Sequence, residues 1–384
     1  MEYNSSIATH SVYVHWPFCP YRCHYCPFVA LAGQDQHMHE YHRALVAEIE
    51  HFGKQAGKRD QLQTLFFGGG TPSTYPSELL LDTFGILSKV FDFQETIEVT
   101  IEVNPGTLTK EELAVWKQAG INRLSVGVQS LKDGVLHELN RMQRVQDVYT
   151  LLDIAPEYVS NISVDLILGL PSVTQEEWKK YLQEIVTWPI KHISIYFLTV
   201  HEDTQLYFKI QKEQIKLPPE EQVVSLYYWT RDILMKHGFF QYELSNFAKP
   251  GYESRHNSVY WDRKPYKAFG LGGCSFDGTH RLQNEKNLLK YMQKVHAQES
   301  ITVFNETLTE KQIYLEKIML NLRRSKGVLW QELNAELSEL QQLELQQRVA
   351  VLKQEGLLHD DGQRLILTVN GLVVENQIIT QLLF

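Results

Sequence analysis

The sequence predicts an α/β protein, an open (β/α)6 partial barrel followed by a C-terminal helical, winged-helix-like module. The chain has 384 residues, of which 43% are hydrophobic, so it can bury a large core. Short segments rich in β-branched and aromatic residues recur along it, and amphipathic helical patterns lie between them. The six strand candidates are residues 11–16, 63–67, 97–103, 123–129, 162–168 and 192–198.

Helical patterns alternate with these strand candidates. They cover residues 37–52, 77–90, 110–118, 145–154, 175–186 and 219–237. Strands that alternate with helices form a parallel sheet with right-handed crossovers. A closed barrel of this kind needs about eight such units. Six units therefore predict an open barrel with its active groups at the carboxyl ends of the strands.

The second half of the chain is organised differently. Residues 249–283 contain turn signals, glycines and aromatic residues but no clear element. Beyond them, residues 307–323 and 328–354 are amphipathic and helical, and residues 356–373 have the pattern of a hairpin. We therefore expect a partial barrel, an irregular segment with a ligand site and the C-terminal module, over residues 1–240, 241–300 and 301–384.

Charge and hydropathy exclude some classes of partner. A formal net charge of −9 provides no overall basic surface for nucleic acid. The acidic Glu332, Glu336 and Glu339 in the C-terminal module also argue against DNA binding. Residues 1–10 lack the pattern of a secretion signal, and no later stretch stays apolar long enough to span a bilayer. We expect a cytoplasmic protein with no nucleic-acid partner and no integral membrane segment.

Three of the four cysteines lie within eight residues, directly after the first strand candidate. They are Cys19, Cys23 and Cys26. One loop can wrap these thiolates around a four-iron cluster and leave one iron open to a substrate. The alternative is a zinc knuckle completed by His15, His24 or Cys274, although Cys-x3-Cys-x2-Cys lacks the paired spacing of structural zinc sites.

Two further groups of side chains are expected to have structural roles and not to bind a metal. Cys274 lies in a glycine-rich stretch, and we expect a small buried residue there rather than a ligand. His37, His39 and His42 could form a metal site on one helix, but a solvated helix start is the expected account.

The stretch YVHWPFCPYRCHYC, residues 13–26, resembles the signature of the radical S-adenosylmethionine (SAM) superfamily. It is similar to the branch of the oxygen-independent coproporphyrinogen III oxidases (HemN) and the haem chaperones of the HemW type. The resemblance covers nearly the whole chain. It implies a [4Fe–4S] cluster on Cys19, Cys23 and Cys26, with SAM chelated to the open iron. It also implies one-electron reduction of SAM by the cluster, which gives methionine and a 5′-deoxyadenosyl radical.

Stretches at successive strand ends match the same branch in order and spacing. By this resemblance, Gly70 and Thr71 in the sequence GGGTP meet the amino group of SAM. Carboxylates suit a ribose diol and an arginine suits a carboxylate. Each such residue alone could be a satisfied polar group at a strand end, but several at successive strand ends favour one site. The residues implied to contact SAM are Glu102, Gln129, Arg141 and Asp165, and those implied to flank the cluster are Tyr13 and Tyr25.

The sequence RHNSVYW, residues 255–261, resembles the HNxxYW motif through which proteins of the HemW type bind haem. An imidazole can ligate haem iron, and aromatic neighbours can pack on the porphyrin. The alternative is a loop whose aromatic residues pin it to the mouth of the barrel. The residues that the resemblance assigns to haem are His256, Asn257, Tyr260 and Trp261.

Two departures from the HemN pattern favour a chaperone over an oxidase. Oxidases of the HemN type carry a longer extension before the first strand, and they place a further cysteine where this chain has Phe28. The chain also departs from the HemW pattern, because Pro27 replaces an aspartate and Gln143 replaces a histidine. We expect a haem chaperone that delivers haem to apo-haemoproteins and that takes electrons from a donor protein. The alternatives are a coproporphyrinogen III oxidase and a radical SAM enzyme with an unrelated substrate, and the sequence leaves open whether SAM is cleaved.

Overall fold

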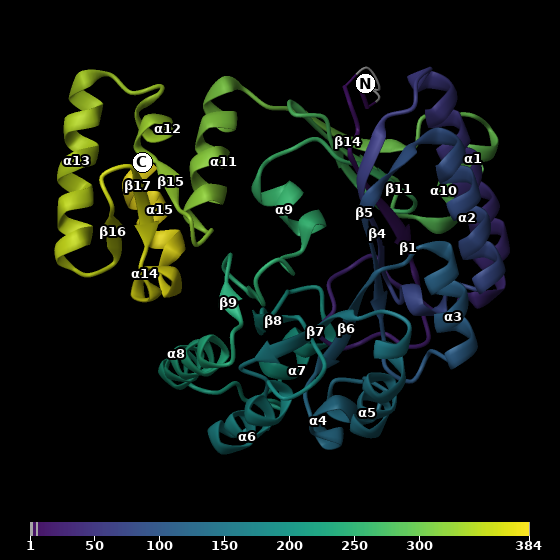
Figure 1. The fold of residues 1–384 in the computed structure, drawn as a ribbon, viewed down its shortest axis with the longest axis horizontal. Helices are drawn as coiled ribbons and strands as arrows, with labels where there is room; N and C mark the ends of the chain where they lie inside the picture. The colour runs from purple at the N-terminus through teal and green to yellow at the C-terminus, as the bar shows by residue number, and fades with distance from the viewer. Residues whose placement is uncertain (1–2, 5–6, 384) are drawn as a thin grey trace.

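The computed structural model of the protein describes residues 3–4 and 7–383. Within these residues, the centre of the molecule is a sheet of nine strands in the order β11-β1-β4-β5-β6-β7-β8-β10-β9 (Figure 1). The six strands in the middle of this order run parallel, and they are the six that the sequence predicts. They are β1 (Ser11–Trp16), β4 (Gln61–Gly69), β5 (Asp92–Val103), β6 (Arg123–Gln129), β7 (Asn161–Leu168) and β8 (His192–Phe197).

Short strands extend this sheet at both edges. On one edge β11 (Lys267–Phe269) pairs in parallel with β1. On the other edge β10 (Asn246–Ala248) pairs antiparallel with β8, and β9 (Phe240–Gln241) pairs antiparallel with β10. No pairing joins β9 to β11 among the described residues, so the prediction of an open barrel is confirmed.

Helices form an arc around the outer face of the sheet, as Figure 1 shows. Hydroxyl side chains begin several of them, because Thr109 and Thr174 each accept a hydrogen bond from the backbone N–H three residues later. Six of these helices fall where the sequence predicts them. They are α1 (Met38–Ala56), α2 (Ser77–Val90), α3 (Lys110–Ala119), α5 (Val145–Ile154), α6 (Gln175–Ile185) and α8 (Glu220–Lys236).

Smaller elements lie in the connections and are not predicted from the sequence. Most of them are too short to show a helical or strand period. They are β2 (Phe18–Cys19), β3 (Leu31–Ala32), η1 (Asp35–His37), η2 (Pro72–Thr74), α4 (Asp133–Glu138), η3 (Ala155–Glu157) and α7 (Gln205–Gln211).

The main hydrophobic core lies between the sheet and the helices. At its centre Trp16 of β1 is fully buried and stacks on Tyr75, with ring centroids 3.8 Å apart. Burial of one large apolar side chain contributes about 1.5–3 kcal/mol to stability. Because this core holds one face of β1 in place through Val12, Val14 and Trp16, it also fixes the start of the cysteine loop, which follows β1 directly.

Residues 249–283, for which the sequence indicated no clear element, are ordered into short ones. The HNSVYW residues lie on the helix α9 (Arg255–Trp261), not on an irregular loop. After β11, a three-stranded antiparallel sheet follows, and α10 (Leu288–His296) packs on α1. Elements of three to seven residues are stabilised by tertiary pairing and leave little periodicity in a sequence. The strands of this second sheet are β12 (Cys274–Phe276), β13 (His280–Asn284) and β14 (Thr302–Thr307).

The C-terminal part, which lies at the left of Figure 1, has a hydrophobic core of its own. The predicted hairpin is confirmed as β16 (Leu358–Asp360) and β17 (Arg364–Leu367). Ion pairs connect this part to the segment after α9, including Arg263 with Glu316 at 2.9 Å. No helix in the described ranges is both long and apolar enough to cross a membrane. The remaining elements are α11 (Glu310–Leu322), β15 (Val328–Leu329), α12 (Trp330–Asn334), α13 (Glu339–Gln354), α14 (Val369–Val373) and α15 (Glu375–Leu383).

Candidate functional site

A cavity of about 380 Å³ lies at the carboxyl ends of the parallel strands. This is the position that a barrel of this type uses for its active groups. Side chains from the cysteine loop and from the ends of β4 to β8 line it together. The sequence-predicted residues on its wall are Cys19, Cys23, Tyr25, Cys26, Gly70, Thr71, Glu102, Gln129, Arg141 and Asp165.

The cysteine loop presents its three free thiols to this cavity. Cys19 is buried at the end of β2, and its sulfur accepts a hydrogen bond of 3.3 Å from the Thr71 hydroxyl. Burial raises the pKa of the Cys19 thiol to about 11. Arg22 shapes the loop, because its guanidinium donates to the backbone carbonyls of Ala30, Cys26 and Phe28.

The arrangement of these thiols helps to decide whether they would hold a single zinc ion or an iron–sulfur cluster. Among the described residues, no group of three or more His, Cys, Asp or Glu side chains is arranged to hold one metal ion. His15, a candidate zinc ligand, is buried, and its two ring nitrogens bond Tyr13 and the Val29 carbonyl. The zinc alternative therefore gains no geometric support. The thiols of a four-iron cluster bind different irons and are more widely spaced than the ligands of a single ion.

The glycines at the end of β4 allow the cysteine loop to approach closely. The Gly70 N–H donates to the Trp16 carbonyl at 2.7 Å, which fixes the glycine stretch against the start of the loop. A Cβ atom at Gly70 would lie 2.5 Å from the Pro17 carbonyl oxygen and 2.8 Å from the Cys19 sulfur. Only a residue without a side chain fits between these two groups.

Replacement of Gly70 with alanine is expected to displace Cys19 and to destabilise the protein by about 1–3 kcal/mol through overpacking. Gly85 is the matched control, because it lies exposed in α2 and a Cβ there would contact nothing within 4 Å. Gly85→Ala should stabilise the helix by about 0.5–1 kcal/mol. Urea unfolding of both variants measures the difference, and equal stability of the two would contradict the close approach at Gly70.

Two carboxyl groups face the cavity from β5 and β7, the strands on either side of β6. Glu102 of β5 accepts a hydrogen bond from the Gly69 N–H at 3.1 Å, and its pKa is raised to about 8 by burial and by the charge of Asp165. Burial also raises the pKa of Asp165. One Asp165 oxygen accepts from Ser125 at 3.0 Å, whereas the other has no hydrogen-bond partner among the described residues. A buried acceptor without a partner fits a ligand hydroxyl, such as those of a ribose.

Replacement of Glu102 with glutamine is expected to stabilise the ligand-free protein increasingly as the pH rises. The folded pKa of about 8 lies above the reference value of 4.5, so the stability that Glu102 contributes is complete below about pH 4.5 and is lost as the pH approaches 8. Glutamine mimics the protonated acid at every pH. Urea midpoints measured between about pH 5 and pH 9 should therefore diverge from those of the wild type, while exposed Glu78→Gln should show no such trend.

Arg141 connects the cysteine loop to the ends of β5 and β6. Its side chain is buried and donates to Asn104 Oδ1 at 2.8 Å, to the Gly127 carbonyl at 2.6 Å and to Gln143 Oε1 at 2.8 Å. It also reaches the Tyr25 hydroxyl at 3.3 Å. Gln143, the residue that departs from the HemW pattern, thus orients Arg141, a role that sequence comparison alone did not indicate.

A chain of hydrogen bonds continues from Arg141 to the first cysteine. Asn104 donates through its amide to the Thr71 hydroxyl at 3.2 Å, and Thr71 donates in turn to Cys19. The other end of Arg141 approaches the Cys23 sulfur at 3.8 Å. One guanidinium therefore positions two of the three cysteines, and Asn104 is a site residue that was not predicted.

Gln129 and Tyr13 occupy different positions relative to the cavity. Gln129 has a φ of 65°, which is unusual for a residue other than glycine, and the pairing of β6 with β7 shifts register at this point. Such strained backbone is concentrated at functional sites, and Gln129 lines the cavity. Tyr13 lies behind the cavity wall, where its hydroxyl bonds His15 at 3.0 Å.

The HNxxYW residues are not part of this cavity. His256 is 1% exposed, and its two ring nitrogens bond the Thr64 hydroxyl at 2.8 Å and the Tyr260 hydroxyl at 2.9 Å. Burial lowers the pKa of His256 to about 3. Coordination of haem iron by one nitrogen of this imidazole would require one of these two hydrogen bonds to break. Asn257 and Trp261 lie on the same helix and also do not line the cavity, so haem binding by this motif stays a prediction.

Two expectations about other side chains are corrected. Cys274 is exposed on the strand β12, where its sulfur accepts from Gln283 at 3.2 Å, and is not a buried residue of a turn. His42 is buried rather than solvated, because its ring nitrogens bond Tyr75 and Asp82, each at 2.9 Å. The burial of His42 depends on partners that are 33 and 40 residues away in the sequence.

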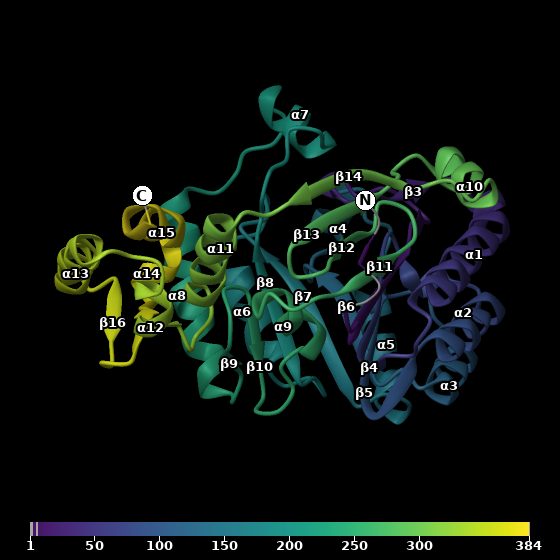
Figure 2. The same cartoon turned by 90° about the horizontal axis from the view of Figure 1, so that it is seen from above.

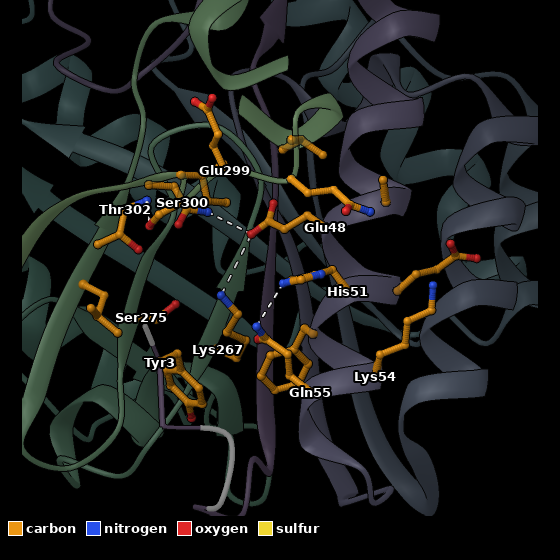
Figure 3. Close-up of a pocket in the computed structure, with 18 residues that line it drawn as sticks. Tyr3, Glu48, His51, Lys54, Gln55, Lys267, Ser275, Glu299, Ser300 and Thr302 are labelled. Atoms are coloured by element: carbon orange, nitrogen blue, oxygen red, sulfur yellow. Dashed lines mark hydrogen bonds and ion pairs between the residues drawn. The ribbon is translucent and has the colours of Figure 1, made fainter. Parts of the chain in front are cut away.

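A second cavity, of about 270 Å³, lies between α1, the β12–β14 sheet and the segment after α10 (Figure 3). Glu48 stands at its inner end, where it accepts hydrogen bonds from Asn284 and Tyr291. Lys267 extends toward Glu48 from β11 (Figure 3). None of the sequence-predicted site residues lines this second cavity.

Two family models match the chain. Residues 13–185 match the model described as the radical SAM superfamily, and residues 308–374 match the HemN C-terminal domain. The first match contains the cysteine loop, the glycine stretch and every strand end that carries a predicted SAM residue. Membership of this superfamily implies a [4Fe–4S] cluster and SAM.

Similar proteins cover nearly the whole chain. The haem chaperone HemW of Bacillus subtilis is 34% identical over 96% of this chain and 97% of its own length. HemW of Synechocystis is 34% identical over 84% of this chain and 80% of its own. The structure of the coproporphyrinogen III oxidase HemN from Escherichia coli, 24% identical, superposes with a TM-score of 0.84 over 98% of this chain and 90% of that one, which confirms the fold. The chain therefore belongs to the HemW family of the radical SAM superfamily.

Proposed function

We propose that this protein is a cytoplasmic haem chaperone that holds a [4Fe–4S] cluster and SAM, binds haem and delivers it to apo-haemoproteins. The observation that carries the proposal is the likeness to relatives named haem chaperone HemW over nearly their full length. The division into residues 1–240, 241–300 and 301–384 belongs to the same proposal. The C-terminal part would then serve as a lid or a docking surface for the receiving haemoprotein.

The residues present fit both cofactors. Cys19, Cys23 and Cys26 would ligate the cluster, because their thiols open into one cavity. The oxygen of Asp165 without a partner, together with Glu102, suits the ribose hydroxyls of SAM. A cluster and SAM bound here would supply one-electron chemistry.

The protein's own contribution is to position these groups. Arg141 holds the cysteine loop against the strand ends, as its contacts with Asn104, Gly127 and Tyr25 indicate. Gly70 lets the Pro17 carbonyl and the Cys19 sulfur pack directly against the end of β4, which fixes the position of the first cysteine. An electron donor would reduce the cluster from the exposed side of the loop, where Phe28 is 65% exposed.

The test is an anaerobic titration of the cluster-reconstituted protein with haem, followed by transfer to apomyoglobin. A chaperone is expected to bind haem stoichiometrically, to pass it on and to leave coproporphyrinogen III unchanged. SAM-dependent formation of a vinyl-bearing product from coproporphyrinogen III would overturn the proposal and identify an oxidase. Absence of binding to either tetrapyrrole would also overturn it, in favour of an unrelated substrate.

A further inference from the structure

We propose that the second cavity, beside α1, is a binding site for a free α-amino acid with an apolar side chain. The proposal goes beyond haem delivery and does not depend on it. Among the described residues, the second cavity shares no lining residue with the cluster cavity. Figure 2, like Figure 1, shows α1 and α10 side by side at the end of the molecule opposite the C-terminal part. The second cavity is therefore a site of its own.

The cavity has room and apolar walls for a small organic molecule. Its volume is about 270 Å³, whereas an apolar cavity of about 150 Å³ already holds benzene. Side chains from four parts of the chain form the apolar wall. They are Phe52 of α1, Leu282 of β13, Val295 of α10 and Ile301 before β14. Walls of this kind favour a ligand with an apolar body.

A pair of opposite charges lies at the inner end of the cavity. The side chains of Glu48 and Lys267 are only 7% and 10% exposed, and the Lys267 nitrogen lies 3.9 Å from Glu48 Oε1. A direct hydrogen bond between charged groups is shorter, about 2.7–2.9 Å. Figure 3 shows these two side chains directed toward one another, while Glu299 points away from them. The Phe269 ring, 4.9 Å from the Lys267 nitrogen, helps to hold the ammonium in place.

Glu48 keeps one acceptor position for a ligand. Its Oε2 accepts hydrogen bonds from the Gly270 N–H at 2.8 Å and from the Tyr291 hydroxyl at 2.6 Å. Its Oε1, the oxygen nearer to Lys267, accepts from the Asn284 amide at 3.0 Å. A carboxylate has about four acceptor positions, so Oε1 has one left. Burial raises the pKa of Glu48, so its charged form would gain from a further cation beside it.

A zwitterion suits this pair better than a ligand with a single charge does. A lone cation at the inner end would meet the Lys267 ammonium, and a lone anion would meet the Glu48 carboxylate. A buried charge is unfavourable unless it is paired. In a free α-amino acid, the carboxylate pairs with Lys267 and the ammonium donates to Glu48, so the pair and the ligand together stay neutral. The apolar side chain of the amino acid then lies against Phe52 and Leu282.

The test measures binding of L-leucine and L-phenylalanine to the cluster-reconstituted protein by isothermal titration calorimetry. Saturating SAM is present to occupy the cluster cavity. Isoamylamine and phenethylamine serve as analogues without the carboxylate, and 4-methylpentanoate and 3-phenylpropanoate as analogues without the ammonium. We expect at least one of the two amino acids to bind, and both of its analogues to bind about tenfold or more weakly. If neither amino acid binds, or if an analogue binds equally well, the proposal is overturned and haem delivery is untouched.

Lys267→Met tests the pairing with the ligand carboxylate. The variant removes the ammonium and keeps an apolar chain of similar length. We expect it to weaken binding of the amino acid about tenfold or more and not to weaken binding of the amine analogue, which has no carboxylate to pair. An equal loss for both ligands would indicate a damaged cavity instead of a lost ion pair, and it would overturn the role of Lys267.

A second variant tests the place of the site without touching the charges. Ala47 lies on α1 and lines the cavity, so the ring in Ala47→Phe should fill it and abolish binding of the amino acid. Ala350, an exposed residue of α13, provides the matched control, and Ala350→Phe should bind as the wild type does. Wild-type affinity in Ala47→Phe would place the amino acid elsewhere and overturn the proposal.

Discussion

Replacement of Cys23 with serine is expected to abolish the iron–sulfur cluster, which is the largest effect that we predict. Cys23 lies at the centre of the loop, its sulfur faces the cavity and the Arg141 guanidinium approaches it at 3.8 Å. Serine is a poor ligand for iron in such a cluster, because a hydroxyl is far less readily deprotonated than a thiol. Iron content after anaerobic reconstitution should fall from about four irons per chain to near zero, with loss of the visible absorption.

The fourth cysteine of the chain provides the control for this experiment. Cys274 is exposed on β12 and does not line the cluster cavity. Cys274→Ser should therefore keep the full iron content. A Cys23 variant that still assembled four irons, or equal loss in the Cys274 variant, would contradict the assignment of the cluster to the loop.

Replacement of Arg141 with methionine is expected to destabilise the protein by about 3 kcal/mol and to prevent tight binding of SAM. The substitution leaves the acceptor oxygens of Asn104, Gly127 and Gln143 without their donor in a buried place. It also breaks the chain of hydrogen bonds to Cys19 through Asn104 and Thr71. Urea unfolding measures the stability, and equilibrium dialysis of SAM with the reconstituted protein measures the binding.

Arg144 serves as the matched control for Arg141. It lies three residues further along, and its side chain is 73% exposed in an ion pair with Asp147. Exposed ion pairs of this kind contribute at most about 1 kcal/mol. Arg144→Met should therefore be close to the wild type in both measurements. If Arg141→Met unfolded at the same urea concentration as Arg144→Met, the positioning role of Arg141 would be wrong.

The sequence predicted the parallel strands well because each is a short apolar run with a physical reason to be buried. The strands β1 and β6 have the predicted bounds, and β8 ends one residue earlier than predicted. The C-terminal ends of these strands then had to meet at one edge, so Glu102 and Asp165 could be expected in one cavity. Local pattern and fold agree here, and prediction from sequence succeeds for that reason.

The environment of α9 could not be predicted in the same way. Two hydrogen bonds hold His256 in its buried position. One joins its ring to the Thr64 hydroxyl, and in the other the Glu98 carboxylate accepts from the His256 backbone N–H at 2.9 Å. These partners lie more than 150 residues away in the chain, so no local pattern encodes them. Asn104 and Gln143 were missed for a different reason, because their role is to position Arg141, which their own sequence pattern does not show. A motif match thus identified the residues of α9 but not whether their side chains are accessible.

The inner side of the curved sheet is crossed by a segment of chain that polar side chains hold in place. The segment from β10 to α9 is attached at one end to β8 through strand pairing. At the other end Glu98 and Thr64 hold it against β5 and β4, with the Glu98 carboxylate bonding the first two N–H groups of α9. It therefore links β8 to β4 and β5 across the inner side of the curved sheet. A change at Glu98 is therefore expected to loosen this link, although Glu98 itself does not line the ligand cavity.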